Sequence, residues 1–379
     1  MGYLLYKDYE SGLNNNLMSL ELAVGLAYLT QRKLVYYGSR GVGKQLQPCR
    51  GGYYWQIPVS RQGVINQGAV PTILDIVDPL PIEIIDYVSF CREIYGQKCT
   101  CYHSPIRLVE STFVASQTPI VPDCLAAFAE GRTLLRDVEQ DVWHLSACNF
   151  GYYSRFFYSP TPSLYEILQG VHPRSIYLNL AQKIAQTLGQ FNGIHVRLTD
   201  YRCSIPGVDK NYAGRILQNI QANFCPQELL LICTDESENK DFFREITHRY
   251  RNHLFLDEWI VHEFKAEFKA LPFTDEQTLG LICNLVMGYA QEFAGTLRST
   301  YTGMIHRNWL KNRLKTTPDL GLPFQYIDSG LGARPVSFRH GIYLETQAGL
   351  FSWNRIQFPL YSDEKSWFRE WPESVILML

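Results

Sequence analysis

Between residues 175 and 310, short apolar runs of strand length alternate with longer runs of helical periodicity, and this alternation constrains the fold more than any other feature of the sequence. The pattern predicts strands at 193–198, 229–233, 254–256 and 292–294, and helices at 178–188, 212–224, 241–250, 276–289 and 302–310. Such alternation is typical of a parallel sheet with helices on both faces.

The amino-terminal end opens in the same way. Predicted strands at 3–6 and 33–37 flank a helix that extends from Leu17 to about Thr30, which is the start of a parallel sheet with a right-handed crossover. We therefore expect an α/β fold with two Rossmann-like domains, 1–180 and 181–379, facing each other across a cleft. Ligands of such sheets bind at the carboxyl ends of the strands, so the chemistry is expected in the loops there.

Composition and charge argue against several classes of protein. The formal net charge is −2 and no basic stripe is present, which argues against nucleic acid as a main partner. No stretch approaches the ~20 apolar residues of a membrane helix, so we expect no integral membrane segment and a cytoplasmic location. Cysteines such as Cys233 and Cys283 lie in apolar runs, which indicates reduced thiols. The cluster Cys99, Cys101 and His103 lacks a second pair of ligands, and we expect no metal site.

The first candidate site lies at the end of the strand 193–198. A period of two places His195 and Arg197 on one face and Ile194 and Val196 on the other. Buried parallel strands are usually apolar throughout, so a His and an Arg here need a polar partner. A diphosphate fits, because a guanidinium offers a rigid fork of donors to phosphate oxygens. A structural pair between Arg197 and Asp200 is an equally good interpretation.

A second candidate site is the segment 295–302, between a short strand and a helix. Ser299, Thr300 and Tyr301 begin the helix, where backbone N–H groups and the positive end of the helix dipole favour an anion. Arg298 beside them also suits phosphate. A simple helix cap, with no ligand, remains the alternative.

Two weaker candidates follow other strands. Gly12 lets the backbone approach a ligand closely, and the amides of Asn14 and Asn15 can donate or accept hydrogen bonds. Asp235 follows the apolar strand 229–233 and could receive donors from a base or a ribose. A turn with an Asn cap, and an Asp that caps the next helix, are the structural alternatives.

In their order along the chain, these segments resemble the fucosyltransferase superfamily, which includes protein O-fucosyltransferases, core α1,6-fucosyltransferases and rhizobial chitin-oligosaccharide fucosyltransferases. The strongest match is the His-x-Arg-x-x-Asp signature, formed here by His195, Arg197 and Asp200. Leu198 and Thr199 stand where the family often has a second Arg or a Gly. The subfamily therefore stays open.

Two further segments support the resemblance. Residues 11–15, with the helix and the strand 32–35 that follow, are similar to the family's Gly-rich turn, helix and Arg-Thr-Leu-Val strand. Residues 290–301 are similar to its late Ala-Asp-Phe loop with Ser-Ser/Thr-Phe, with Glu292 where Asp is frequent. Residues 45–175 and the tail have no counterpart in this resemblance.

The resemblance implies a GT-B-type fold and an inverting, metal-independent transfer of fucose from GDP-fucose, with no cofactor besides this donor substrate. Arg197 would bind the β-phosphate and assist its departure. The residues implied to contact GDP-fucose are Gly12, Asn14, Asn15, His195, Asp200, Asp235, Glu292, Arg298, Ser299, Thr300 and Tyr301. Glu10 is the candidate catalytic base, although the base could also come from the acceptor side or be dispensable. The implied partners are the nucleotide-sugar donor and an acceptor glycan or protein.

Two other functions compete with this interpretation. A protein of the same fold could bind a nucleotide sugar without turnover, because fold does not determine function. The segment 38–45 is close to a phosphate-binding P-loop with Lys44, which would suit an NTPase. However, Gln45 cannot supply the hydroxyl that ligates Mg²⁺, and Pro48 makes a poor helix start.

Overall fold

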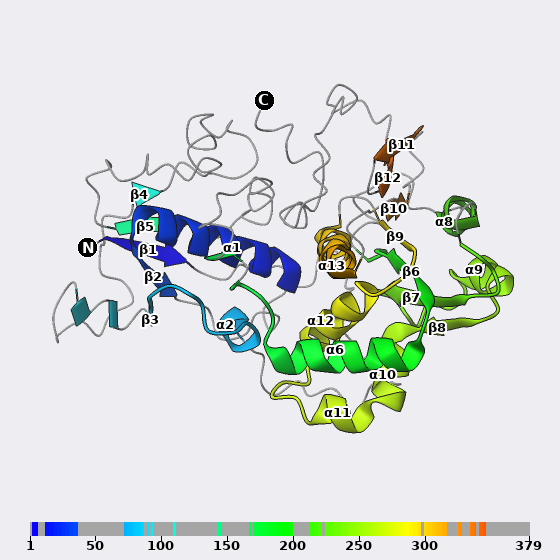
Figure 1. Ribbon diagram of the computed structural model, residues 1–379, viewed down its shortest axis with the longest axis horizontal. Helices are drawn as coiled ribbons and strands as arrows, with labels where there is room; N and C mark the ends of the chain where they lie inside the picture. Colours follow the sequence, from blue (N-terminus) through cyan, green and yellow to red (C-terminus); the bar gives the residue numbers. More distant parts are fainter. Residues whose placement is uncertain are drawn as a thin grey trace. The chain divides into compact units, whose positions relative to one another are not determined.

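The chain consists of two compact units in the computed structural model. The residues that the structure describes are 2–6, 12–36, 72–86, 89–90, 92–93, 109–110, 142–145, 167–168, 170–199, 212–221, 224–296, 299–316, 324–327, 334–338 and 341–345. Those up to Ser175 form the amino-terminal unit, and those from Ile176 form the carboxyl-terminal unit (Figure 1).

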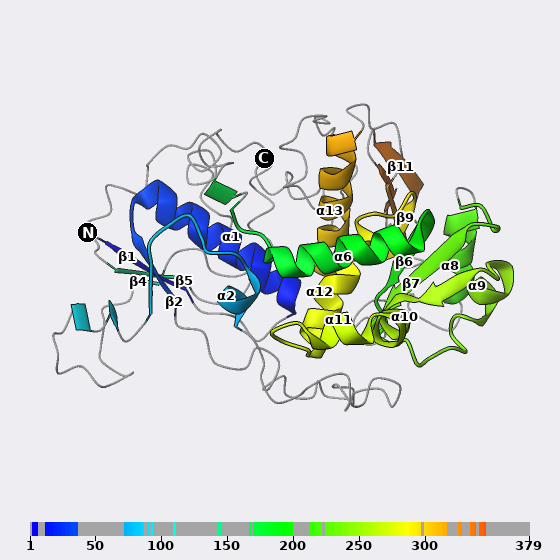
Figure 2. The ribbon, with the colours of Figure 1, turned by 60° about the horizontal axis from the view of Figure 1, so that its bottom comes forward.

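The amino-terminal unit is built on a five-stranded parallel sheet in the order β3-β2-β1-β5-β4. Its elements are β1 (Tyr3–Tyr6), α1 (Leu13–Thr30), β2 (Lys33–Tyr36), α2 (Ile73–Ile76), β3 (Ile84–Asp86), β4 (Val109–Glu110) and β5 (Val142–Leu145). Strand β1 pairs with β2 on one side and with β5 on the other. The helix α1 runs along β1 and β2, as Figure 2 shows.

Helix α1 begins four residues earlier than the sequence predicts. Gly12 is extended, with φ −60° and ψ 152°, and its carbonyl accepts hydrogen bonds from the N–H groups of Asn15 and Asn16 at 3.0 and 3.3 Å. Buried Leu13, Leu17, Leu20, Val24 and Ala27 then recur at helical spacing along the face that packs inward. The asparagines after Gly12 therefore belong to the first helical turn and not to the preceding loop.

The carboxyl-terminal unit contains a seven-stranded sheet in the order β11-β12-β10-β9-β6-β7-β8. Its elements are α6 (Ser175–Leu188), β6 (Phe191–Val196), α8 (Tyr212–Gln221), β7 (Leu229–Thr234), α9 (Arg244–Arg249), β8 (His253–Phe255), α10 (Leu256–Glu263), α11 (Lys265–Lys269), α12 (Glu276–Met287), β9 (Phe293–Thr296), α13 (Thr300–Thr316), β10 (Phe324–Ile327), β11 (Arg334–Phe338) and β12 (Gly341–Glu345). Every described pair is parallel except β11 with β12. The predicted parallel sheet is confirmed.

The two faces of this sheet pack against different helices. One face meets α8 and α9 in a core that includes Ile194, Val196, Leu230, Ile232, Tyr212, Ile216, Phe243 and Ile246. The other face meets α12 and α13, since the ring of His195 packs on Tyr301 and a Cβ on Gly193 would lie 2.7 Å from Met287 Cε. Figure 1 shows these two pairs of helices on opposite sides of the strands. The predicted alternation along β6 is confirmed for Ile194, His195 and Val196.

Helices α10 and α11 and strands β10, β11 and β12 fall outside the predicted elements. The predicted strand 254–256 is displaced by one residue, because β8 starts at His253 and Leu256 begins α10. Buried Leu256, Ile260 and Val261 carry a helical spacing that the sequence pattern already contained.

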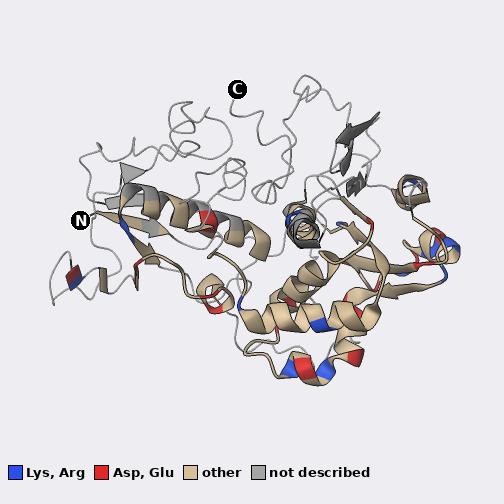
Figure 3. Cartoon of the chain, viewed as in Figure 1, with Lys and Arg blue, Asp and Glu red and all other residues tan. Residues whose placement is uncertain are grey.

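Charges of both signs are interspersed on the surface helices of the carboxyl-terminal unit. Figure 3 shows basic and acidic residues close together along α9 and α11. Lys183 contacts Glu267, and Arg244 contacts Asp241, both as exposed pairs. In the described part of the chain, no helix is long and apolar enough to span a membrane.

Candidate functional site

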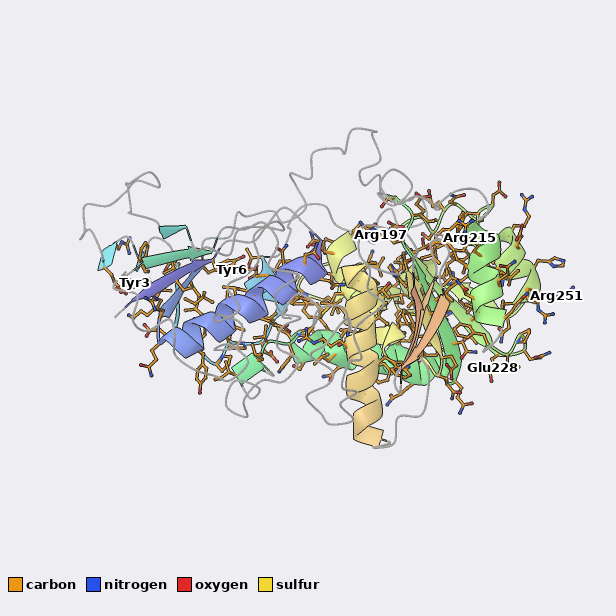
Figure 4. The ribbon with its side chains drawn as sticks, turned by 90° about the horizontal axis from the view of Figure 1, so that it is seen from above. Tyr3, Tyr6, Arg197, Arg215, Glu228 and Arg251 are labelled. Atoms are coloured by element: carbon orange, nitrogen blue, oxygen red, sulfur yellow. The ribbon has the colours of Figure 1, made fainter. Side chains whose placement is uncertain are left out.

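The carboxyl ends of β6, β7 and β9 meet at one edge of the carboxyl-terminal sheet. The register pairs Val196 with Thr234 and His195 with Gly295, so the residues that follow these strands leave the sheet together. Arg197 follows β6, Asp235 follows β7 and Thr296 ends β9. This is the edge where parallel α/β sheets bind their ligands. Figure 4 labels Arg197 there.

Asp235 holds the chain segment that follows β6. Its Oδ1 accepts a hydrogen bond from Leu198 N at 2.8 Å, and its Oδ2 accepts from Thr199 N at 3.2 Å and from Thr199 Oγ1 at 2.6 Å. Arg197 Nε lies 3.2 Å from the same Oδ2. The Asp235 side chain is 9% exposed and the Arg197 side chain 30% exposed, so the carboxylate is the buried partner of the pair.

Thr296 joins β9 to the end of β6. Its hydroxyl donates to the carbonyl of His195 at 3.1 Å and accepts from Arg197 N at 2.9 Å. Both backbone groups that flank Val196 are therefore satisfied by one side chain from the neighbouring strand. Together with Asp235, this contact fixes the backbone from which the Arg197 side chain projects.

His195 is buried beside the start of α13. Its Nδ1 lies 2.7 Å from Thr302 Oγ1, and its ring packs on the ring of Tyr301 with centroids 4.6 Å apart. Burial, and secondarily the positive charge of Arg197, lower the pKa of His195 to about 3. The imidazole is therefore uncharged at neutral pH.

Gly295 makes the contact between His195 and α13 possible. It is the register partner of His195, and a Cβ there would lie 2.3 Å from Thr302 Cγ2 and 2.9 Å from Thr302 Oγ1. Only a residue without a side chain lets α13 approach β9 this closely. The glycine thus brings the first turn of α13 against the end of the sheet.

Replacing Gly295 with alanine is expected to lower the free energy of unfolding by about 2 kcal/mol, because the added methyl overlaps Thr302 and forces the first turn of α13 away. Urea titration followed by circular dichroism measures the change. Gly280→Ala is the matched control, since a Cβ there meets nothing closer than Tyr301 Cε2 at 3.9 Å, and alanine favours the helix. Equal stability of the two variants would contradict the close approach.

The amino-terminal end of α13 lies against this edge of the sheet. Ser299, which is buried, precedes the first helical residue, and its carbonyl accepts a hydrogen bond from Gly303 N at 3.0 Å. A helix of this length presents N–H groups and a partial positive charge at its start. The start of α13 and Arg197 therefore add two sources of positive potential at one edge.

The phenol of Tyr301 is engaged inside the unit. Its hydroxyl donates to Gly280 O at 2.6 Å and lies 3.5 Å from Cys233 Sγ. Burial is the main reason that the pKa of Tyr301 is raised above its usual value. Asn284 Nδ2 donates to the Tyr301 carbonyl at 3.0 Å. These contacts fasten the start of α13 to α12.

Glu292 lies at the opposite edge of the sheet from Arg197 and Asp235. It precedes β9, its N–H donates to Asn192 Oδ1 at 3.2 Å, and Asn192 Nδ2 donates to Glu228 Oε2 at 2.6 Å. These residues lie at the amino ends of β6, β7 and β9. Figure 4 labels Glu228 well away from Arg197. The predicted segment around Glu292 therefore spans the strand from one edge of the sheet to the other.

The remaining predicted residues fall into three groups. Gly12, Asn14 and Asn15 belong to the amino-terminal unit, where Asn14 is 5% exposed and its Nδ2 has no hydrogen-bond partner among the described residues. Thr300 begins α13. Outside the described residues lie Glu10, Asp200, Arg298, the P-loop-like segment 38–45, and the cluster Cys99, Cys101 and His103.

Three threonines at this edge carry contacts that the sequence interpretation did not assign. Thr199, Thr296 and Thr302 supply the hydroxyls that meet Asp235, the β6 backbone and His195. Each stands just after a strand, at the end of a strand or in the first turn of a helix, where a hydroxyl can meet backbone or buried polar groups. A threonine at one of these positions is the sequence feature from which such contacts could be expected.

Solved structures that resemble this one include fucosyltransferases. NodZ from Bradyrhizobium is 14% identical, with 80% of this chain and 92% of that chain covered and a TM-score of 0.39. POFUT1 in complex with GDP is 11% identical, with 86% and 98% covered and a TM-score of 0.40. A variant of FUT1 from Arabidopsis thaliana in complex with GDP is 12% identical, with 89% and 72% covered and a TM-score of 0.41. No family model and no curated protein matches the chain.

Proposed function

We propose that this protein is a glycosyltransferase that transfers fucose from GDP-fucose to a glycan or protein acceptor, with inversion and without a metal ion. The observation that supports the proposal is the placement of Arg197. Its guanidinium is held by Asp235 at the carboxyl ends of the central strands, it is partly exposed, and its backbone is tied to Thr296, three residues before Ser299 at the start of α13.

The chemistry of the transfer calls for positive charge at such a place. When the bond between the anomeric carbon of fucose and the β-phosphate oxygen breaks, the departing diphosphate gains negative charge. A guanidinium fork and the positive end of α13 stabilise that charge, and they are in place before the reaction begins. In this proposal Arg197 therefore does the work that a metal ion does in other transferases.

The identity of the donor comes from the sequence resemblance. The His-x-Arg-x-x-Asp signature and the two further segments resemble fucosyltransferases, and GDP-fucose follows from that family. In this proposal the acceptor hydroxyl attacks from the face opposite the diphosphate, and Glu10 takes its proton. Asn14, whose side-chain amide is buried, is kept in this proposal as a candidate donor-binding residue.

Guanine nucleotides are expected to stabilise the protein, and uridine nucleotides are not. A ligand that binds only the folded state at 100 times its Kd adds about 2.7 kcal/mol to the free energy of unfolding. Thermal unfolding with GDP, GDP-fucose, UDP and UDP-glucose at equal concentrations measures this. A higher midpoint with UDP than with GDP would contradict the choice of donor.

Turnover separates an enzyme from a protein that only binds a nucleotide sugar. Labelled fucose from GDP-fucose is expected to appear on acceptors in a glycan array or a lysate. Stabilisation by GDP-fucose without transfer to any acceptor would favour the binding protein.

A further inference from the structure

We propose that Asp235 is a positioning residue that orients Arg197 toward the departing diphosphate, and that it is not a ligand of the nucleotide. The proposal rests on the function proposed above. It changes the role that the sequence resemblance implies for Asp235, which is a direct contact with GDP-fucose.

The hydrogen bonds of the Asp235 carboxylate support this role. An ionised carboxylate has about four lone-pair sites. Leu198 N occupies Oδ1, while Thr199 N, Thr199 Oγ1 and Arg197 Nε all approach Oδ2. The donors that surround the carboxylate come from three consecutive residues of this chain, which leaves little capacity for a base or a ribose.

The exposed fractions of the two side chains also support a positioning role for Asp235. The Asp235 side chain is 9% exposed, whereas the Arg197 side chain is 30% exposed and lies on the solvent side of the pair. Asp235 follows β7 and Arg197 follows β6, so the ion pair joins the ends of two adjacent strands. A ligand at this edge would meet the guanidinium, and the carboxylate would act through it.

Preorganisation explains why the pair matters for the reaction. A free arginine side chain samples many rotamers, and a transition-state contact is strong only if the charge is already oriented. Asp235 holds the Nε side of the guanidinium while Thr296 fixes Arg197 N. Removing the carboxylate should therefore lower kcat more than it raises KM for GDP-fucose, because the orientation is most important in the transition state.

A double-mutant cycle tests the proposal. Asp235→Asn is expected to lower kcat by about 10- to 100-fold in the wild-type background, as for a misplaced catalytic group. In an Arg197→Lys background the same substitution should change kcat by less than about 2-fold, because the fork that it orients is already gone. Asp241→Asn is the matched control: its exposed carboxylate also pairs with an arginine, Arg244, and kcat should stay unchanged.

The outcomes are distinct. Equal losses in both backgrounds, or a rise in KM with kcat unchanged, would overturn the proposal and favour a direct contact with the nucleotide. If Asp235→Asn loses cooperative thermal unfolding, Asp235→Glu takes its place in the cycle, because it keeps the charge and displaces it by one methylene. A wild-type protein that neither binds GDP nor transfers fucose would overturn the proposed function itself, and this inference with it.

Discussion

Replacing Arg197 with alanine is expected to reduce fucose transfer by about 100-fold or more, which is the scale of losing one preorganised stabiliser of transition-state charge. The loss should appear in kcat, because the diphosphate is more negative in the transition state than in the bound donor. Steady-state assays with labelled GDP-fucose measure it. Because the side chain is partly exposed, and Asp235 keeps its donors from Leu198 and Thr199, the fold should remain intact.

Two comparisons make this prediction specific to the guanidinium. Arg197→Lys is also expected to be poor, because an ammonium is a point charge that cannot replace the fork. Arg244→Ala removes an arginine that is 77% exposed and paired with Asp241, and it should transfer at the wild-type rate. Turnover by Arg197→Ala at the wild-type rate would remove the proposed role of this residue.

The two faces of β6 could be predicted from the sequence because the period of two along a strand is a local property. Alternation along 193–198 put Ile194 and Val196 on one face and His195 on the other, and the structure has them so. The strands β1 and β7 were predicted to within one residue, because continuous apolar runs bounded by polar residues mark buried parallel strands.

Partners that are distant in sequence could not be predicted in the same way. For Arg197 the sequence suggested Asp200, which is three residues away and outside the described residues. The structure pairs Arg197 with Asp235, which comes close only because β6 and β7 are neighbours in the sheet. Strand order is a tertiary property that hydrophobic periodicity does not encode.

Glu292 illustrates a second limit of local patterns. The sequence resemblance places it with Ser299 and Tyr301, because all three belong to the segment 290–301. The strand β9 runs between them, and a parallel strand carries the chain from one edge of its sheet to the other. Glu292 therefore lies at the opposite end of β9 from Ser299 and Tyr301.

Acidification is expected to destabilise the protein through His195. The pKa of this residue is about 3 in the folded protein and about 6.5 in an unfolded chain, so between these values the unfolded state binds a proton that the folded state does not. The stability that the neutral imidazole of His195 contributes to the folded protein is fully present above pH 6.5 and is lost as the pH falls. Between pH 7 and pH 4 the loss is about 3 kcal/mol, measured by urea titration at each pH.

The variant His195→Phe isolates this contribution. The phenylalanine keeps a ring against Tyr301 and removes the titrating group. Between pH 7 and pH 4 the free energy of unfolding of this variant should fall by about 3 kcal/mol less than that of the wild type. The neighbours of His195 do not mask the effect: Arg197 stays charged throughout, and the raised pKa of Tyr301 keeps its phenol neutral. Parallel pH profiles for wild type and His195→Phe would mean that the imidazole takes up its proton without unfolding, and that the contact with Thr302 does not depend on a neutral ring.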